Sequence, residues 1–191
     1  MKGRESGMPE ESYWASFFDV ELALDTLIGK GVQEENVVEF GCGFGTFTLP
    51  VALRTKGILT ALDLEPDMIA LVRYKASQLH CNNIQVVQRD FVADGTGLDA
   101  GSQSHAMIYN LLHLEDPVAL LREARRILNS VGTLSVMHWR SDILTPRGPS
   151  LDIRPQPEQC ARWLTEAGFG IVRHVNLNSS CPYHYGLVAS C

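Results

Sequence analysis

The sequence predicts an α/β fold in which one mostly parallel sheet carries helices on both of its faces. Short apolar runs alternate with stretches whose apolar residues recur at helical spacing, and parallel strands need such helical crossovers. The last two apolar runs, 171–177 and 184–189, have no helical stretch between them, so they should pair antiparallel. With 191 residues, 45% of them hydrophobic, the chain suits one domain, 1–191.

Apolar periodicity and helix-capping residues predict the elements in chain order. Strands are expected at 37–41, 58–64, 84–89, 105–110 and 133–139. Helices are expected at 12–28, 46–56, 66–80, 116–128 and 158–167. Asp or Pro favours the start of a helix and Gly its end; such residues are Gly29, Gly31, Pro66, Asp116, Pro117 and Gly168. Polar stretches rich in Gly or Pro, 94–103 and 140–157, should be loops.

Composition excludes several classes of protein. The net charge of −6 lacks the positive field that nucleic-acid binding usually needs, which disfavours such a partner. The five cysteines are widely spaced, without a CxxC pair or a metal-ligand pattern, so we expect free thiols and no metal. The sequence contains neither a signal peptide nor an apolar run of the roughly 18 residues that a membrane helix needs. A soluble, cytoplasmic protein is expected.

The strongest chemical signal is the segment Glu39-Phe40-Gly41-Cys42-Gly43-Phe44-Gly45, which follows a strand and opens a helix. Glycines there let the backbone turn sharply and approach a ligand, and the helix start offers unpaired N–H groups. The dinucleotide pattern GxGxxG fails, because Thr46 or Thr48 occupies its last position. The acid at Glu39 suits a cationic amine and repels a pyrophosphate.

Two further acids end the next two strands. Asp63 lies 18 residues after Gly45, where a carboxylate can accept hydrogen bonds from a ribose diol. Asp90, followed by Phe91, could accept from an adenine amino group beside an aromatic ring. An isolated Asp at a strand end is usually a cap, but three acids at the carboxyl ends of three parallel strands indicate a nucleotide-type site at that edge.

With these motifs, the chain resembles class I S-adenosylmethionine-dependent methyltransferases over 35–190. EFGCGFG resembles the family's first motif, ALDLEPDMI its ribose segment, and QRDF its adenine segment; YNLLHLEDPVALLREARRIL resembles the fourth strand and following helix of small-molecule methyltransferases. The resemblance implies a Rossmann-like, doubly wound seven-stranded sheet of order 3-2-1-4-5-7-6 with strand 7 antiparallel. It also implies S-adenosylmethionine as cofactor and S-adenosylhomocysteine as product.

The resemblance assigns cofactor contacts to four segments. The methionine part would be held by Glu39 and the loop backbone, the ribose by the Asp63 segment and the adenine by the Asp90 segment, while the Asn110 region would border the amine. The residues implied are Glu39, Gly41, Cys42, Gly43, Gly45, Asp63, Leu64, Asp90, Phe91 and Asn110. One departure is the turn 129–132, where Val131 replaces a glycine of the family's Lys-Pro-Gly-Gly and is awkward at positive φ.

The acceptor side shows no fixed constellation, since methyl transfer from a sulfonium mainly needs alignment and exclusion of water. His113 and His138 are candidates for a general base; alternatively, His113 packs its loop or contacts the cofactor. Trp139 could cover the acceptor and Arg140 could bind an anion, or both could simply pack. With Arg147 and Arg154, Arg140 could also clamp a carboxylate or phosphate; a solvated loop is the alternative.

The N-terminal arm and helix, 1–30, carry Tyr13 and Trp14, which could bind substrate under a lid or belong to the core. No Asn-Pro-Pro-Tyr segment follows the fourth strand, which favours a small-molecule acceptor, with anionic ones as candidates. A pocket cover could come from this arm, from 140–157 or from the second subunit of a homodimer. The rivals are a protein or RNA methyltransferase, a non-catalytic S-adenosylmethionine-binding module and, least favoured, a nicotinamide-dependent oxidoreductase.

Overall fold

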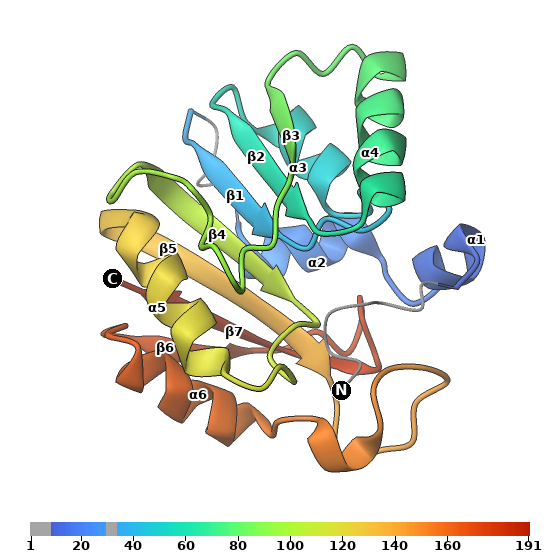
Figure 1. Cartoon of the computed structure of the whole chain (residues 1–191). Helices are drawn as coiled ribbons and strands as arrows, with labels where there is room; N and C mark the ends of the chain where they lie inside the picture. Colours follow the sequence, from blue (N-terminus) through green and yellow to red (C-terminus); the bar gives the residue numbers. More distant parts are fainter. Residues whose placement is uncertain (1–8, 30–33) are drawn as a thin grey trace.

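The computed structural model describes residues 9–29 and 34–191 and has a seven-stranded sheet of order β3-β2-β1-β4-β5-β7-β6. Figure 1 shows the strands in this order, and all neighbours pair in parallel except those of β7, which runs antiparallel to both β5 and β6. The strands are β1 (Val37–Phe40), β2 (Leu59–Asp63), β3 (Ile84–Gln88), β4 (Gln103–Tyr109), β5 (Leu128–Trp139), β6 (Val172–Val175) and β7 (His184–Ser190). The predicted fold class and strand order are confirmed.

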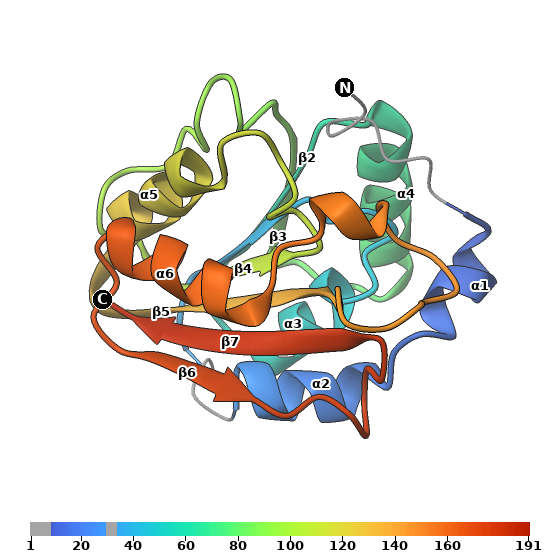
Figure 2. The same cartoon turned by 90° about the horizontal axis from the view of Figure 1, so that it is seen from below.

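Helices cover both faces of the sheet, as Figure 2 shows with α5 and α6 on one side and α2 and α3 on the other. The helices are α1 (Glu11–Ala15), α2 (Val20–Leu27), α3 (Thr48–Arg54), α4 (Pro66–Gln78), α5 (Pro117–Ile127) and α6 (Pro157–Glu166). Alternation along β1 divides the core: Val38 and Phe40 pack toward α5 and α6, whereas Val37 packs toward α2 and α3. Glu39 therefore shares the face of α3.

The N-terminal helix expected over 12–28 is two helices in the structure. The first helix, α1, ends at its C-cap Ser16. Asp19 is the N-cap of the second helix, α2, and its side chain accepts a hydrogen bond from the Leu22 N–H at 3.1 Å. The Asp19 N–H donates to the backbone oxygen of Ser180 at 2.7 Å, so a distant loop fixes the break. Gly29, at φ 69°, ends α2 as expected, whereas the predicted end at Gly31 lies outside the described residues.

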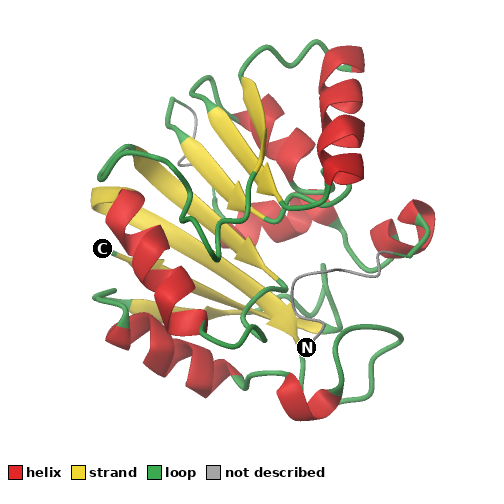
Figure 3. Cartoon of the chain, in the orientation of Figure 1, coloured by secondary structure: helices red, strands yellow, loops and turns green. Residues whose placement is uncertain are grey.

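Two predicted boundaries around β4 and β5 were wrong. β4 begins at Gln103, inside the expected loop, and β5 begins at Leu128, so that residues 129–132 belong to the strand instead of a separate turn. Neither Val131 nor Gly132 adopts a positive φ, so the expected strain at Val131 does not arise. Figure 3 shows a loop without a helix between β3 and β4.

The carboxyl ends of the parallel strands meet at one edge. In Figure 1 the arrowheads of β1, β4 and β5 point toward this edge, where the loop after β5 also lies. The loop 140–157 contains one short 3₁₀ helix, Leu151–Ile153, which periodicity did not predict. Because β7 is antiparallel, its first residue, His184, lies opposite Trp139 of β5 at the same edge. This edge brings the predicted site residues together.

Candidate cofactor and acceptor site

The glycine loop after β1 is folded tightly and packed closely. Gly41, Gly43 and Gly45 have φ values of 75°, 49° and 78°, a region that side chains disfavour. A Cβ on Gly41 would lie 3.2 Å from the Leu111 side chain, and one on Gly45 would lie 3.1 Å from Val72. The loop therefore needs glycine both for its backbone conformation and for the approach of its neighbours.

Glu39, the last but one residue of β1, lies just before this loop and is 3% exposed. The hydroxyl of Thr48, the first residue of α3, donates a hydrogen bond to the Glu39 carboxylate. Burial, together with the nearby negative charge of Asp63, raises the pKa of Glu39 to about 8, although the hydrogen bond from Thr48 lowers it. A cationic group brought beside Glu39 would favour its charged form.

Asp63, at the end of β2, ties the glycine loop to the start of α4. Its two carboxylate oxygens accept hydrogen bonds from the Gly43 N–H at 2.8 Å and the Glu65 N–H at 3.0 Å. Each carboxylate oxygen has a second lone pair, so Asp63 can still accept from a ribose diol. The geometry fits the predicted ribose contact.

The segment after β3 forms one wall of a small pocket. This pocket is lined by Leu64, Arg89, Asp90, Phe91, Val92, Leu111 and Leu114. Asp90 holds the local turn by accepting a hydrogen bond from the Ala93 N–H at 3.0 Å, and Phe91 is 9% exposed. Most residues that line this pocket are apolar, and Leu64 lines it together with Leu111 of the β4 loop. It contains both residues of the predicted adenine contact, Asp90 and Phe91.

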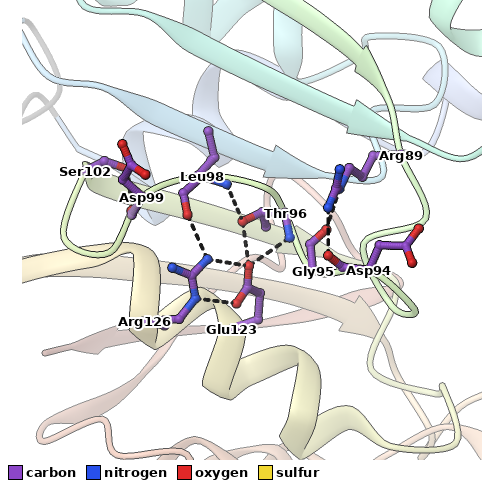
Figure 4. Close-up of polar contacts among 9 residues, drawn as sticks. All are labelled: Arg89, Asp94, Gly95, Thr96, Leu98, Asp99, Ser102, Glu123 and Arg126. Atoms are coloured by element: carbon purple, nitrogen blue, oxygen red, sulfur yellow. Dashed lines mark hydrogen bonds and ion pairs between the residues drawn. The ribbon is translucent and has the colours of Figure 1, made fainter.

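The long connection from β3 to β4 is anchored by a polar network, drawn in Figure 4. Glu123 of α5 accepts from the N–H and the hydroxyl of Thr96 at 2.8 and 2.6 Å, and from Arg126 of the same helix. These bonds hold the pKa of Glu123 near 2. Arg89 donates to the backbone oxygens of Gly95 and Asp94, both at 2.7 Å. The network fixes the loop that carries Asp90 where a helix is lacking.

Asn110, the first residue after β4, is one of two non-glycine residues with positive φ in the described chain, at 60°. Its Nδ2 lies 3.4 Å from Nε2 of His184, whereas its Oδ1 is shielded from solvent and has no hydrogen-bond partner among the residues that the structure describes. A buried acceptor without a donor is costly unless a ligand supplies one. An ammonium group there would satisfy it, so Asn110 and Glu39 fit the amine of S-adenosylmethionine.

His113 and His138 lie together on the acceptor side. His113 Nδ1 is 3.2 Å from His138 Nε2, and His138 Nδ1 is 3.1 Å from the backbone oxygen of Trp139. Burial and the charge of Arg154 lower the pKa of both rings, that of His138 to about 3. His138 is fully buried and His113 is partly exposed, so only His113 is placed to meet a ligand.

Aromatic side chains from the N-terminal segment pack against the end of β5. The Trp14 ring lies 6.3 Å from that of Trp139, which is 2% exposed and packs against the His184 ring at 4.1 Å with a tilt of 38°. Tyr13 is 45% exposed and contacts the Phe17 ring at 4.9 Å. Lys75 of α4 ties the segment down by pairing with Glu11 and donating to the Phe44 oxygen at 2.9 Å. The segment therefore covers part of the site edge, with Trp139 beneath it.

The predicted anion clamp has a different arrangement. Arg154 is 8% exposed, and its guanidinium donates to loop oxygens: those of Pro149 and Arg140 at 2.7 and 2.9 Å, with Arg147 and Thr145 completing the set. Arg154 thus organises the loop 140–157. The Arg140 side chain forms an ion pair with Asp142 at 2.7 Å, and the backbone oxygen of Arg147 accepts a hydrogen bond from Arg154. The acceptors of Arg154 within the described residues are backbone and hydroxyl oxygens, and its positive charge lies close enough to His113 and His138 to lower the pKa of both.

A cavity of about 480 Å³ opens at the same edge, between the start of α6, the loop 140–157 and the β6–β7 connection. It is lined by Arg140, Ser141, Asp142, Gln156, Pro157, Glu158, Val175, Asn176, Leu177, Asn178, His184 and Tyr185. Its size suits a small molecule. His184 connects it to Asn110, on the side of the predicted cofactor amine.

Sequence reasoning missed four contributors: Thr48, Leu111, His184 and the structural role of Arg154. Thr48 could have been found as the first residue of the helix after the glycine loop, and His184 as the start of a strand antiparallel to β5. Leu111 and Arg154 act through distant contacts that the sequence does not indicate. Among the described residues, no cluster of side chains could hold a metal ion, and no helix is long and apolar enough to cross a membrane.

The fold and the site define a Rossmann-like domain with a nucleotide-type pocket at the carboxyl edge of its sheet. Residues 37–132, half of the chain, match the sequence model of the methyltransferase domain. The chain belongs to this family, which confirms the predicted class of S-adenosylmethionine-dependent methyltransferases.

Solved structures agree in fold. An S-adenosylmethionine-dependent methyltransferase from Aquifex aeolicus is similar with a TM-score of 0.79 and 21% identity, over 95% of this chain and 93% of that one. Geranyl diphosphate methyltransferase in complex with S-adenosylmethionine is similar with a TM-score of 0.67 and 14% identity, over 94% and 84%.

One curated relative, a 23S rRNA (uracil(1939)-C(5))-methyltransferase of Histophilus somni, is 35% identical over 71 residues. The match spans 37% of this chain and 16% of that protein. It therefore says little about the acceptor of this chain.

Proposed function

We propose that the chain transfers the methyl group of S-adenosylmethionine by in-line displacement to a small-molecule acceptor, with anionic acceptors favoured. The observation that carries this proposal is the unpartnered Oδ1 of Asn110, shielded from solvent at the same edge as buried Glu39. Both groups suit a cationic amine. Asp63 would bind the ribose, Leu64, Asp90 and Phe91 would surround the adenine, and the backbone of Gly41, Cys42, Gly43 and Gly45 would approach the methionine part.

Size and charge support the acceptor class. The cavity of about 480 Å³ suits a small molecule, and the buried charge of Arg154 favours an anion over a cation near His113. Arg140 lines this cavity, and Trp139, Tyr13, Trp14 and Arg147 are proposed to contact the acceptor from the end of β5 and the covering segments. In this proposal the chain acts as one domain, 1–191, and a homodimer stays a prediction.

The proposal is tested by calorimetric titration of the purified chain with S-adenosylmethionine, S-adenosylhomocysteine and NAD in parallel. We expect both sulfur ligands to bind and NAD to show no heat of binding. Binding of NAD alone would contradict the cofactor assignment and every contact derived from it. Bound sulfur ligands without turnover on any acceptor of a small-molecule panel would favour the non-catalytic module, and turnover on RNA or protein alone would favour the macromolecular enzyme.

His113→Ala should lower turnover about 10²-fold on an acceptor whose nucleophile must lose a proton, because that is a typical contribution of a positioned base. Cofactor affinity should not change, since His113 faces β5 and not the adenine pocket. Steady-state kinetics and calorimetry measure the two effects separately. His174→Ala, which removes an exposed histidine from β6, is the control. Normal turnover of His113→Ala on such an acceptor would exclude a role as base.

A further inference from the structure

The hydrogen bonds around His138 allow only one arrangement of protons. His138 Nδ1 lies 3.1 Å from the backbone oxygen of Trp139, and a carbonyl oxygen can only accept. The Nδ1 of His138 must therefore carry a hydrogen. Because the ring is fully buried and its pKa is lowered to about 3, it is neutral at pH 7, and its Nε2 has a lone pair and no hydrogen.

The same logic extends to His113. Its Nδ1 lies 3.2 Å from the His138 Nε2, which can only accept. The hydrogen between the two rings therefore belongs to Nδ1 of His113. Burial and the charge of Arg154 lower the pKa of His113, so this ring is also neutral at pH 7. The Nε2 of a neutral His113 with its hydrogen on Nδ1 is unprotonated and can take up a proton.

We propose that His138 is a positioning residue. It donates from Nδ1 to the Trp139 carbonyl and accepts at Nε2 from Nδ1 of His113, and so keeps Nε2 of His113 unprotonated and able to accept a proton. The inference deepens the proposed function and rests on it. When His113 Nε2 takes the proton of the acceptor, the acceptor's electron pair forms the bond to the methyl carbon. The carbon–sulfur pair returns to sulfur, and the proton stays on His113, which still donates from Nδ1 to His138.

The arrangement gives a role to the fully buried histidine at the last but one position of β5. An apolar residue would pack there at no cost in desolvation, but it could not accept from His113. Without that acceptor, His113 would be free to carry its hydrogen on Nε2, and the nitrogen available to an acceptor would then be a donor. Rotation of the His113 ring would also be less restricted.

The test is the tautomer of His113, measured by long-range ¹H–¹⁵N correlation spectra of the full chain with ¹⁵N-labelled histidine at pH 7. His113 is assigned by the signal that His113→Gln removes. We expect an unprotonated Nε2 and a protonated Nδ1 for His113, with the same pattern for His138. A His113 protonated on Nε2 would overturn the inference.

Two substitutions of His138 sharpen the test. In His138→Gln, the Oε1 can lie near the position of the former His138 Nε2, so the tautomer of His113 should be kept. In His138→Phe, the side chain cannot accept a hydrogen bond, so the hydrogen of His113 should move to its Nε2. An unchanged tautomer in His138→Phe would also overturn the inference. If His138→Phe does not fold, the spectra of the wild type and His138→Gln still decide.

These spectra need neither cofactor nor acceptor, so their outcome is independent of the calorimetric test of the proposed function. Once an acceptor is identified, His138→Phe should lower kcat about 10²-fold, the contribution of the base it positions, with little change in KM. His138→Gln should recover most of that loss. A merely structural role would predict equal loss in both variants, which would contradict the inference.

Discussion

Asp63→Ala is expected to weaken the binding of S-adenosylmethionine by about 10²-fold or more. The substitution removes the carboxylate and with it the charge-assisted hydrogen bonds to the ribose, each worth about 1.5–3 kcal/mol. It would also release the Gly43 and Glu65 N–H groups that it now holds at 2.8 and 3.0 Å, so the glycine loop would lose part of its preformed geometry. Calorimetric titration measures the affinity, and thermal unfolding of the ligand-free variant measures the structural part of the effect.

Two comparisons separate the ribose contact from the support of the loop. An analogue of the cofactor without the ribose hydroxyls should bind the wild type weakly, and Asp63→Ala should no longer distinguish it from S-adenosylmethionine. Asp67→Asn removes a nearby exposed charge from the first turn of α4 and should leave affinity within about twofold, because it touches no predicted ligand atom. Equal affinity of Asp63→Ala and the wild type would exclude Asp63 from the ribose site.

Glu39→Gln is expected to stabilise the ligand-free fold while weakening cofactor binding. In the folded chain the pKa of Glu39 is raised from its usual 4.5 to about 8. Between these values the unfolded chain has lost the proton that the folded chain keeps. Stability of the wild type therefore falls as pH rises from about 4.5 to 8, and this contribution is fully lost above pH 8. Glutamine is neutral throughout and can still accept from Thr48.

The gain of Glu39→Gln in free energy of unfolding should vanish below pH 4.5 and reach up to about 3 kcal/mol at pH 7. This pH lies 2.5 units above the pKa of the unfolded chain, and each unit corresponds to about 1.4 kcal/mol. Denaturant unfolding at several pH values measures it. Glu35→Gln, which neutralises an exposed carboxylate before β1, is the matched control and should show no comparable pH dependence. A Glu39→Gln variant less stable than the wild type at pH 7 would contradict the assigned protonation.

Cofactor binding should respond in the opposite direction. The ammonium of the cofactor favours ionised Glu39, so binding at pH 7 should release about one more proton from the wild type than from Glu39→Gln. Titrations in buffers of different ionisation enthalpy count these protons. Affinity of the variant should fall about 10-fold to 10²-fold, the usual worth of a charged hydrogen bond. Equal proton release in both proteins would exclude Glu39 from the amine site.

Much of the fold followed from local patterns. The strands β1 and β2 and the second halves of β4 and β5 are largely apolar runs, and the helices α4 and α5 begin with Pro, so these segments are determined largely by their own residues. The order of the strands came from the resemblance to a family. The break at Asp19 was missed, because it depends on a hydrogen bond to Ser180, which is distant in sequence.

The sequence by itself predicted the cofactor side of the site. Glu39, Asp63 and Asp90 each lie at or within two residues of the carboxyl end of a strand. These ends must meet at one edge of a parallel sheet, so the chemistry could be predicted from local patterns. Only the tertiary structure decided what these groups touch. The pairs Glu39–Thr48, Asn110–His184 and His113–His138 each join different elements. Their distances, and with them the protonation of Glu39 and the tautomer of His113, depend on how those elements pack, which hydrophobic burial sets across the whole core.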